Sequence, residues 1–395
     1  MTLLRRAART LTLSLSLTAA GAFCVVSAAP PAPASVRAPV GGSQLAAPGV
    51  IVNLKPGVPP PPAMPGASFV LADMDTGQIL VARAPHARHL PASTLKTLTA
   101  LTLIPLLDAK AKILVQPADV RAEGTHLGIL AGTSYSVGTL LQGMLMVSGN
   151  DAAYALARAN HSMAVTLRAM NATAAELNAF DTVAKDPSGL DKPGQSTSAY
   201  DLALIGRAAM KLPDFRRYVI TKRGSVPGGR SADGKLQPGF KISSHNHLLF
   251  NYPGAIGVKS GYTIAAQQTF IGAATRAGKT YIVTQMASPN GSWRPHAALL
   301  DWAFAHGTSV TPIGSLVEPG VPPTPQVTAA AGSVPPLVPS PAHRDAALQP
   351  AFPPWIGAAA LIGAMLLLFG LWQRRHSRRR IADKLGSRTH ARTPS

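Results

Sequence analysis

Cysteine is almost absent from this 395-residue sequence, which contains only Cys24. Cys24 lies in an apolar run over residues 11–26, which three arginines precede and the small residues 27–29 follow. This pattern predicts a secretory signal peptide over residues 1–29. Phe23 before the cysteine is a poor fit to a lipoprotein cleavage site, so we do not expect lipidation. The exported protein is therefore expected to have no disulfide and no thiol chemistry.

Long hydrophobic runs are also scarce. Besides the run over residues 11–26, a second one covers residues 355–372. It is uncharged, has tryptophan at both ends and is followed at once by five arginines. A buried core helix is the alternative, but such a helix rarely carries a flank of this kind. The run predicts a transmembrane helix that joins the membrane to the rest of the chain. By the positive-inside rule, residues 373–395 form a basic cytoplasmic tail and the chain before residue 355 lies outside the cell.

Acidic residues are few, with 17 Asp and Glu against 37 Lys and Arg, which gives a net charge of +20. The tail over 373–395 holds +7 of this charge and the leader +3, so about half remains for the exported part. Because the densest basic run flanks the predicted membrane helix, no nucleic acid is expected as a partner. A basic exported domain suits an anionic cell wall.

Metal and phosphate motifs are missing as well. The eleven histidines show no metal-ligand spacing, and the only close pair, His245 and His247, is assigned a loop role. No glycine-rich loop of the kind that cradles phosphates occurs. We therefore expect no metal and no cofactor.

Proline-rich segments over residues 30–66 and 311–354 frame one globular region over residues 67–310. Such composition favours extended spacers without a core. The region between them is long enough for one sizeable domain, and we find no internal repeat.

Within this domain the hydrophobic pattern changes from strand to helix and back. Alternation and turn residues predict a pair of strands near its start, helices in its middle, and three strands with a closing helix near its end. The predicted strands are 67–72, 78–82, 256–259, 270–275 and 280–286, and the predicted helices begin at Ser93, cover 137–145, resume near Asp151 and cover 296–306. Strands at both ends predict an α+β fold with an antiparallel sheet flanked by a helical region.

Three short motifs carry the chemistry. Ser93-Thr94-Leu95-Lys96 places a hydroxyl and an amine one helical turn apart, so a lysine can serve as base for a serine nucleophile without any histidine. Ser148-Gly149-Asn150 and Lys259-Ser260-Gly261 follow in that order. A lone Ser-x-x-Lys occurs by chance, but the ordered set predicts a catalytic site.

Catalytic roles follow from the residue types. Ser93 is the predicted nucleophile and Lys96 its base, with a pKa that the nearby cation of Lys259 would lower. Ser148 can relay a proton between the amine and the leaving group. Taken singly, each of these residues would most simply have a surface or helix-capping role. Their occurrence together, in this order, favours a catalytic role.

Substrate binding is predicted for a second set of residues. Asn150 has both a donor and an acceptor for a substrate amide, and Lys259 with the Ser260 hydroxyl can bind a carboxylate. The backbone N–H groups of Ser93 and Tyr262 can form an oxyanion hole.

Five segments resemble the serine D-alanyl-D-alanine carboxypeptidases, which are low-molecular-mass penicillin-binding proteins, over nearly the whole globular region. These segments are 91–96, 148–153, 186–191, 199–203 and 257–263. The resemblance implies a β-lactamase/transpeptidase-like fold and a role for Thr263 in substrate binding. It further implies removal of the terminal D-alanine from peptidoglycan stem pentapeptides through an acyl-enzyme on Ser93. β-Lactams would be covalent inhibitors, and the domain would act on the cell-wall side of the membrane.

Two positions depart from the family pattern. Ser260 stands where threonine is commonest, which keeps the hydroxyl. His245 falls about where some relatives carry an arginine that assists carboxylate binding, so that role is open here.

Three alternatives remain at this stage. A β-lactamase needs a deacylation base, typically in Glu-x-x-Leu-Asn, whereas this chain offers only Glu176-Leu177-Asn178 and has Gly149 where class A enzymes usually have aspartate. A DD-endopeptidase that cuts crosslinks would use the same chemistry. A catalytically silent cell-wall binding protein would not become labelled by fluorescent penicillin.

Overall fold

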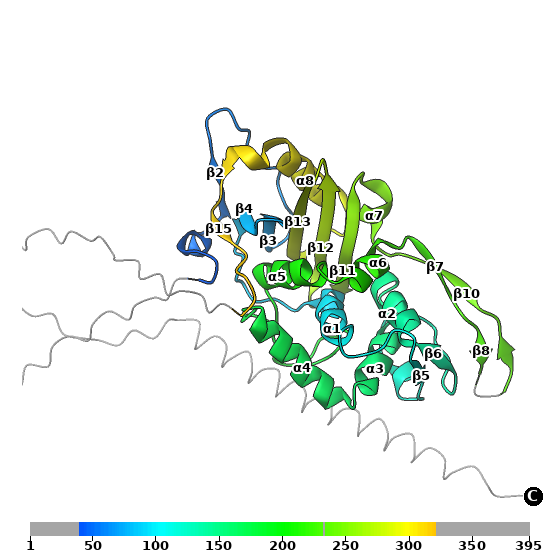
Figure 1. The fold of residues 1–395 in the computed structure, drawn as a ribbon. Helices are drawn as coiled ribbons and strands as arrows, with labels where there is room; N and C mark the ends of the chain where they lie inside the picture. Colours follow the sequence, from blue (N-terminus) through cyan, green and yellow to red (C-terminus); the bar gives the residue numbers. More distant parts are fainter. Residues whose placement is uncertain (1–38, 232–233, 321–395) are drawn as a thin grey trace, which may run out of the picture. The chain divides into compact units, whose positions relative to one another are not determined.

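An antiparallel sheet of seven strands organises the computed structural model, which describes residues 39–231 and 234–320 (Figure 1). Its strands are β1 (Val50–Ile51), β3 (Ser68–Asp73), β4 (Gln78–Arg83), β11 (Ala255–Thr263), β12 (Gln267–Arg276), β13 (Lys279–Ser288) and β15 (Gly314–Ser315). The order across the sheet is β1-β4-β3-β13-β12-β11, and β15 also pairs with β4. The first and last parts of the domain therefore share one sheet, as predicted, and β11 forms the edge opposite β1.

Both faces of the sheet are covered, because successive side chains along a strand point to opposite faces and pack on different helices. On β3, Val70 belongs to the same buried cluster as Leu202 of α5 (Ala199–Ala209). The next residue, Leu71, belongs to the cluster that includes Leu299 of α8 (Arg294–His306). One face of the sheet therefore packs on α5 and the other on α8.

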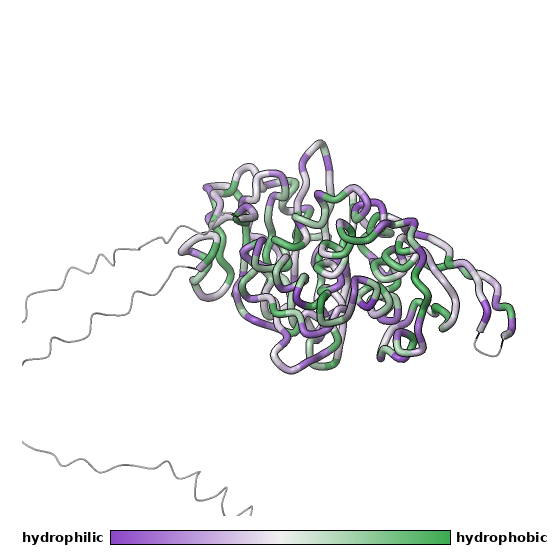
Figure 2. Tube along the Cα trace, turned by 60° about the horizontal axis from the view of Figure 1, so that its bottom comes forward, coloured by the Kyte–Doolittle hydropathy of each residue, from purple (hydrophilic) through white to green (hydrophobic). Residues whose placement is uncertain are grey.

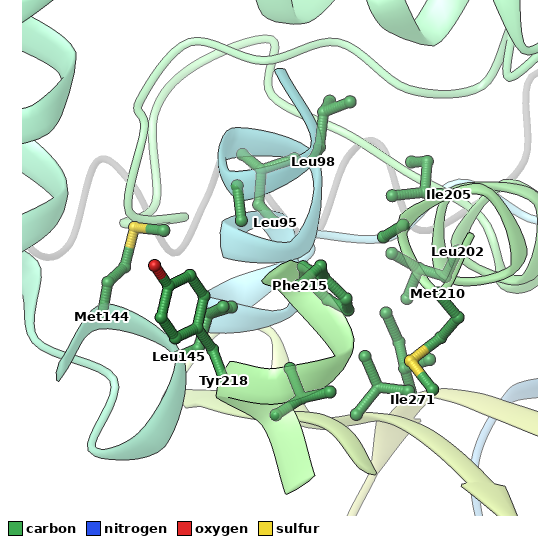
Figure 3. Close-up of a cluster of buried hydrophobic side chains, with 14 of the residues drawn as sticks. Leu95, Leu98, Met144, Leu145, Leu202, Ile205, Met210, Phe215, Tyr218 and Ile271 are labelled. Carbon is green, nitrogen blue, oxygen red and sulfur yellow. The ribbon is translucent and has the colours of Figure 1, made fainter. Parts of the chain in front are cut away.

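A helical region adjoins the α5 face of the sheet. Its helices are α1 (Lys96–Leu103), α2 (Val137–Met146), α3 (Asn150–Ala159), α4 (Met163–Glu176) and α6 (Pro213–Ile220). Helix α7 (His247–Asn251) lies on the α8 side instead, because its Leu248 belongs to the same buried cluster as Leu299. Apolar side chains from α1, α2, α5, α6 and β12 meet in one cluster, which includes Leu98, Met144, Phe215 and Ile271 (Figure 3). Hydrophobic colouring runs through the interior strands and helices, and hydrophilic colouring gathers on outer loops (Figure 2).

Serine side chains set the start of three of these helices. The Ser136, Ser162 and Ser198 hydroxyls accept hydrogen bonds from the backbone N–H three residues later, at 3.1 to 3.2 Å. Each cap satisfies a backbone donor that the first turn leaves free. The predicted helix over 137–145 is confirmed, and it begins where Ser136 caps it.

Short elements complete the described part. They are the 3-10 helices η1 (Ser43–Ala46), η2 (Ala92–Leu95), η3 (Asp119–Arg121) and η4 (Gly307–Ser309), and the strands β2 (Asn53–Leu54), β5 (Lys112–Leu114), β6 (Ser134–Ser136), β7 (Arg223–Val226), β8 (Gly229–Arg230), β9 (Leu236–Gln237), β10 (Phe240–Ser243) and β14 (Val310–Thr311). Strands β7 and β10 pair with each other, as do β8 and β9, and together they form an arm that projects from the helical region (Figure 1).

The described part of the domain extends past the predicted 67–310 boundaries on both sides. Residues 50–51 and 314–315 both pair with β4, and Leu45 and Met64 are buried. Trp302 Nε1 donates to the carbonyl of Pro59 at 2.9 Å. Prolines lack an N–H but keep their carbonyl acceptor, so a proline-rich segment can pack on a domain without forming long strands.

The other predicted segments lie wholly or partly outside the described residues. These are the signal peptide 1–29, the first residues of 30–66, most of the linker 311–354, the membrane helix 355–372 and the tail 373–395. Among residues 39–231 and 234–320, no helix is long and apolar enough to cross a membrane.

Candidate active site

Ser93 lies in η2, and Lys96 begins α1 directly after it. Lys96 Nζ donates to Ser93 Oγ at 2.9 Å. Ser93 is half-buried, whereas the Lys96 side chain is completely buried. The predicted pair is thus assembled within one helical turn, with the hydroxyl reachable and the amine shielded from water.

Two further acceptors hold the amine of Lys96. Its Nζ donates to Asn150 Oδ1 at 2.7 Å and to the backbone carbonyl of Ser188 at 2.6 Å. The Asn150 amide nitrogen in turn donates to the carbonyl of Glu123. Lys96 therefore has three fixed partners, which come from η2 (Ser93), the start of α3 (Asn150) and the loop that carries Ser188.

The pKa of Lys96 is held well below the ordinary value of a lysine. Burial is the largest cause, and the positive charge of Lys259 adds to it. Asp186 and Asp151 act in the opposite direction. The lowered pKa favours the neutral amine, which is the form that can take a proton from a serine hydroxyl.

Asp186 shapes the loop that carries the Ser188 carbonyl. Its Oδ1 accepts from the backbone N–H of Ser188 at 2.7 Å and of Gly189 at 3.0 Å, and from the Ser188 hydroxyl at 2.6 Å. Gly189 has a φ of +87°, and a Cβ there would lie 1.8 Å from the carbonyl oxygen of Ala92. The loop can therefore approach η2 only with glycine at this position.

Ser148 lies in the turn between α2 and α3, where its φ is 63°. It is buried, with 8% of its surface exposed. Asp151 fixes the neighbouring loop, because its carboxylate accepts from the backbone N–H of Leu127 at 2.7 Å and of Gly128 at 2.8 Å. The hydrogen bond from Lys96 to Asn150 ties this turn to the Ser93–Lys96 pair.

Strand β11 brings the third motif to the same place. A Cβ on Gly261 would lie 2.6 Å from the backbone nitrogen of Ser93 and 2.9 Å from that of Thr94. The missing side chain lets the edge strand touch η2 directly. As predicted, the structure brings all three motifs together.

Lys259 is 2% exposed, and its Nζ donates to the carbonyl of Ser260 at 2.6 Å. Burial lowers the pKa of Lys259 to about 7. Among the described residues, no carboxylate lies within 4.0 Å of its Nζ. This amine is therefore an available cation for an incoming anion.

Tyr262 and Thr263 lie at the end of β11, farther toward the surface. The Tyr262 side chain is 59% exposed. The Thr263 hydroxyl donates to Asp191 Oδ1 at 3.0 Å and accepts from the backbone N–H of Ala266 at 2.9 Å. The Thr263 hydroxyl is thus engaged in hydrogen bonds within the chain. The bond to Asp191 joins the end of β11 to the 186–191 loop.

His245 lies beside the motif on β11. Burial, Lys259 and His247 all lower its pKa, which favours the neutral ring. It lines the same cavity as Ser260. The structure places a neutral ring, not a cation, near the predicted carboxylate-binding residues.

Three functional groups were not predicted as site residues: the Ser188 carbonyl, Asp186 and Asp151. Segments 148–153 and 186–191 carried the available signal, since Asp-Pro-Ser-Gly is a turn sequence. Within the part of the chain that the structure describes, no three His, Cys, Asp or Glu side chains form a metal-binding group.

A protein-family model for D-alanyl-D-alanine carboxypeptidases (Peptidase S11) matches residues 57–290. The chain belongs to this family. A curated relative from Mycobacterium tuberculosis, D-alanyl-D-alanine carboxypeptidase DacB2, is 40% identical over 264 residues, which cover 65% of this chain and 88% of the relative. DacF of Bacillus subtilis is 30% identical, and the match spans 62% of its length.

Solved structures of carboxypeptidase-family members have the same fold. A D-alanyl-D-alanine carboxypeptidase from M. tuberculosis H37Rv matches with a TM-score of 0.62 at 39% identity, over 67% of this chain and 99% of that one. The Streptomyces K15 DD-transpeptidase matches with a TM-score of 0.59 at 29% identity, over 62% of this chain and all of that one. The predicted family, the α+β transpeptidase-like fold and the serine carboxypeptidase function are confirmed.

Proposed function

We propose that Ser93 is the nucleophile of this carboxypeptidase and that its substrate is the D-alanyl-D-alanine end of peptidoglycan stem pentapeptides. The hydrogen bond of 2.9 Å between buried Lys96 Nζ and Ser93 Oγ carries this proposal. Ser93 Oγ attacks the carbonyl carbon of the penultimate D-alanine while neutral Lys96 takes the hydroxyl proton. The backbone N–H groups of Ser93 and Tyr262 bind the oxyanion.

The tetrahedral intermediate then breaks its C–N bond. A proton reaches the leaving amine from Lys96 through Ser148, and D-alanine departs. Water then attacks the acyl carbonyl of the Ser93 ester. Its oxygen enters the new carboxylate, one of its protons returns to Ser93 Oγ, and the other is released to solvent. Asn150 holds the substrate amide, and Lys259 with Ser260 binds the terminal carboxylate.

Two alternatives have less support. The β-lactamase alternative has less support, because its candidate residue Glu176 ends α4 and is exposed, and the carboxylates of Asp151 and Asp186 accept from backbone N–H groups. A silent binding protein would not need a lysine buried against a serine.

The decisive experiment compares wild type with Ser93→Ala in D-alanine release from a pentapeptide and in labelling by fluorescent penicillin. We expect both signals to vanish in the variant while its unfolding temperature stays within about 2 °C of wild type. Thr97→Ser, one turn from Ser93 and without a catalytic role, is the control and should keep both signals. Covalent labelling of folded Ser93→Ala would refute the assignment.

We also propose that the protein is exported and anchored in the cell membrane by residues 355–372, with the carboxypeptidase domain on the cell-wall side. The uncharged run, its terminal tryptophans and the five arginines that follow support this arrangement. Peptidoglycan peptides and β-lactams would then reach Ser93 from outside.

Protease added to intact spheroplasts tests this topology. We expect loss of the catalytic domain and survival of an epitope tag placed after residue 395. Digestion of the tag with protection of the domain would show the opposite orientation.

A further inference from the structure

A cavity of about 350 Å³, including the space at its open mouth, lies on the α8 side of the sheet next to the active-site edge. Its wall is formed by β11, β12, β13, the start of α7 with the residue two before it, and the start of α8 with the segment before it. The lining residues used below are Ser260, Phe270, Gln285, Trp293, His245 and His296.

Strand register explains how this cavity starts at the catalytic motif. Ser260 on β11 pairs with Phe270 on β12, which pairs with Gln285 on β13. Directly paired residues point to the same face of a sheet. The row therefore leads from Ser260 toward the middle of the sheet, on the face opposite Lys259, over two strand spacings or roughly 10 Å.

Gln285 places a free hydrogen-bonding group at the inner end of this row. Its side chain is 1% exposed, its Oε1 meets His296 Nε2 at 2.8 Å, and its Nε2 has no hydrogen-bond partner among the described residues. Gly66 packs behind it, because a Cβ on Gly66 would lie 2.5 Å from Gln285 Cγ. A buried polar group without a partner is uncommon in native structures and points to a ligand that supplies one.

The rest of the lining combines apolar residues with polar ones such as Gln268, Asn290 and Ser292. Phe270 and Trp293 supply aromatic surface, and no Asp, Glu, Lys or Arg lines the cavity. Burial lowers the pKa of His296 to about 4, so its imidazole is uncharged at neutral pH. The cavity suits an uncharged, partly apolar group that ends in one hydrogen-bonding atom.

We propose that this cavity binds the side chain of the residue that leaves during the reaction, so that the enzyme releases neutral D-amino acids larger than alanine when they end in an amide. This inference rests on the proposed roles of Ser93 and Ser260. In the proposed mechanism the scissile carbonyl lies at the N–H groups of Ser93 and Tyr262, and the terminal carboxylate lies at Lys259 and Ser260, so the leaving residue sits at the cavity mouth. Its side chain can extend over Phe270 toward Gln285, whereas the methyl group of D-alanine leaves the cavity unused.

Peptides that differ only in their last residue test the proposal. Wild type should release D-glutamine from a D-alanyl-D-glutamine end with a kcat/KM about fivefold higher than D-methionine, which has similar length but no amide. This comparison uses only the native enzyme. Equal rates for the two residues, or no release of either alongside normal release of D-alanine, would overturn the proposal.

Gln285→Met should abolish the preference for D-glutamine over D-methionine while keeping D-alanine release and penicillin labelling. Ser68→Ala is the matched control, because the Ser68 hydroxyl is also buried and without a partner but does not line the cavity. It should keep the preference. An unchanged preference in labelled Gln285→Met refutes the cavity assignment, whereas absence of D-alanine release from wild type refutes the carboxypeptidase mechanism itself.

Discussion

Replacing Lys259 by methionine should make the protein more stable at acidic and neutral pH, and less active. Burial lowers the pKa of Lys259 from 10.5 to about 7. At 1.36 kcal/mol per pH unit, holding this amine charged in the fold costs on the order of 5 kcal/mol. The hydrogen bond to the Ser260 carbonyl is lost in the variant, which offsets about 1–2 kcal/mol. We expect a net gain of about 3 kcal/mol at pH 6.

The stability gain of Lys259→Met over wild type should disappear as the pH rises. Between pH 7 and 10.5 the unfolded chain binds the proton that folded Lys259 has lost, so the free energy of unfolding of wild type rises through this window. The pKa of Lys259 is lower in the folded state than in the unfolded chain. The free-energy cost of the buried charge is therefore complete below pH 7 and absent above pH 10.5. Lys259→Met has no such dependence, so the two stability curves should cross between about pH 9 and pH 10. Above the crossing the variant should be less stable by up to the lost hydrogen bond, about 1–2 kcal/mol.

Thermal and urea unfolding of the purified domain from pH 6 to 10 measures this difference. Lys279→Met serves as control, because Lys279 is half-exposed and lies 3.6 Å from Asp73. Its stability should stay within about 0.5 kcal/mol of wild type. The reasoning is refuted if Lys259→Met is the less stable protein at pH 6, or if the curves of variant and wild type run parallel. Loss of Lys259 should also raise the pKa of Lys96, which moves the acid limb of the acylation rate to higher pH.

Two further substitutions test the geometry of the site. Lys96→Ala should slow acylation of Ser93 by several orders of magnitude, as measured by the rate of penicillin labelling, and a near-normal rate would assign the base role to another residue. Gly189→Ala should lower both the unfolding temperature and the activity, because the new Cβ would meet the Ala92 carbonyl as well as strain the backbone. Gly132→Ala has a similar φ, +82°, with open space around it, and should cost only about 1 kcal/mol. Equal effects of the two glycine substitutions would contradict the contact with η2.

Local sequence patterns predicted how the residues within each catalytic motif lie relative to one another, because each motif is short and spans one helical turn or one strand. Ser93 and Lys96 are neighbours on a helix, and Gly261 follows Lys259 on a strand, so spacing alone indicates their relation. The third partner of Lys96 is a backbone carbonyl at Ser188, and any residue type has one. Its role arises from the Asp186 loop, whose shape depends on hydrogen bonds that spacing does not reveal.

The cavity and the domain limits were beyond sequence reasoning for another reason. Gln285 and Ser260 become neighbours of one cavity only through the register of three strands, and a shift of one residue would send them to the opposite face. The two-residue strands β1 and β15 are too short to show alternation, so residues near 50 and 314 were predicted as spacer. Their pairing with β4 depends on tertiary contacts with a strand that was itself predicted.

The position of β15 determines how a pull on the chain after residue 320 would reach the enzyme. Force would first reach the contacts of residues 316–320, where Glu318 pairs with Arg207 of α5 and the N–H of Gly320 donates to the carbonyl of Glu176 at the end of α4. It would then reach β4, on the far side of the sheet from β11 and the Ser93 loop. Strand β15 has only two residues and two paired positions, so it would detach soon after these contacts break, while β3, β13 and β12 stay paired between the load and the site. Because β15 is short and lies at the β4 edge, a chain under tension can lengthen there before the catalytic groups shift.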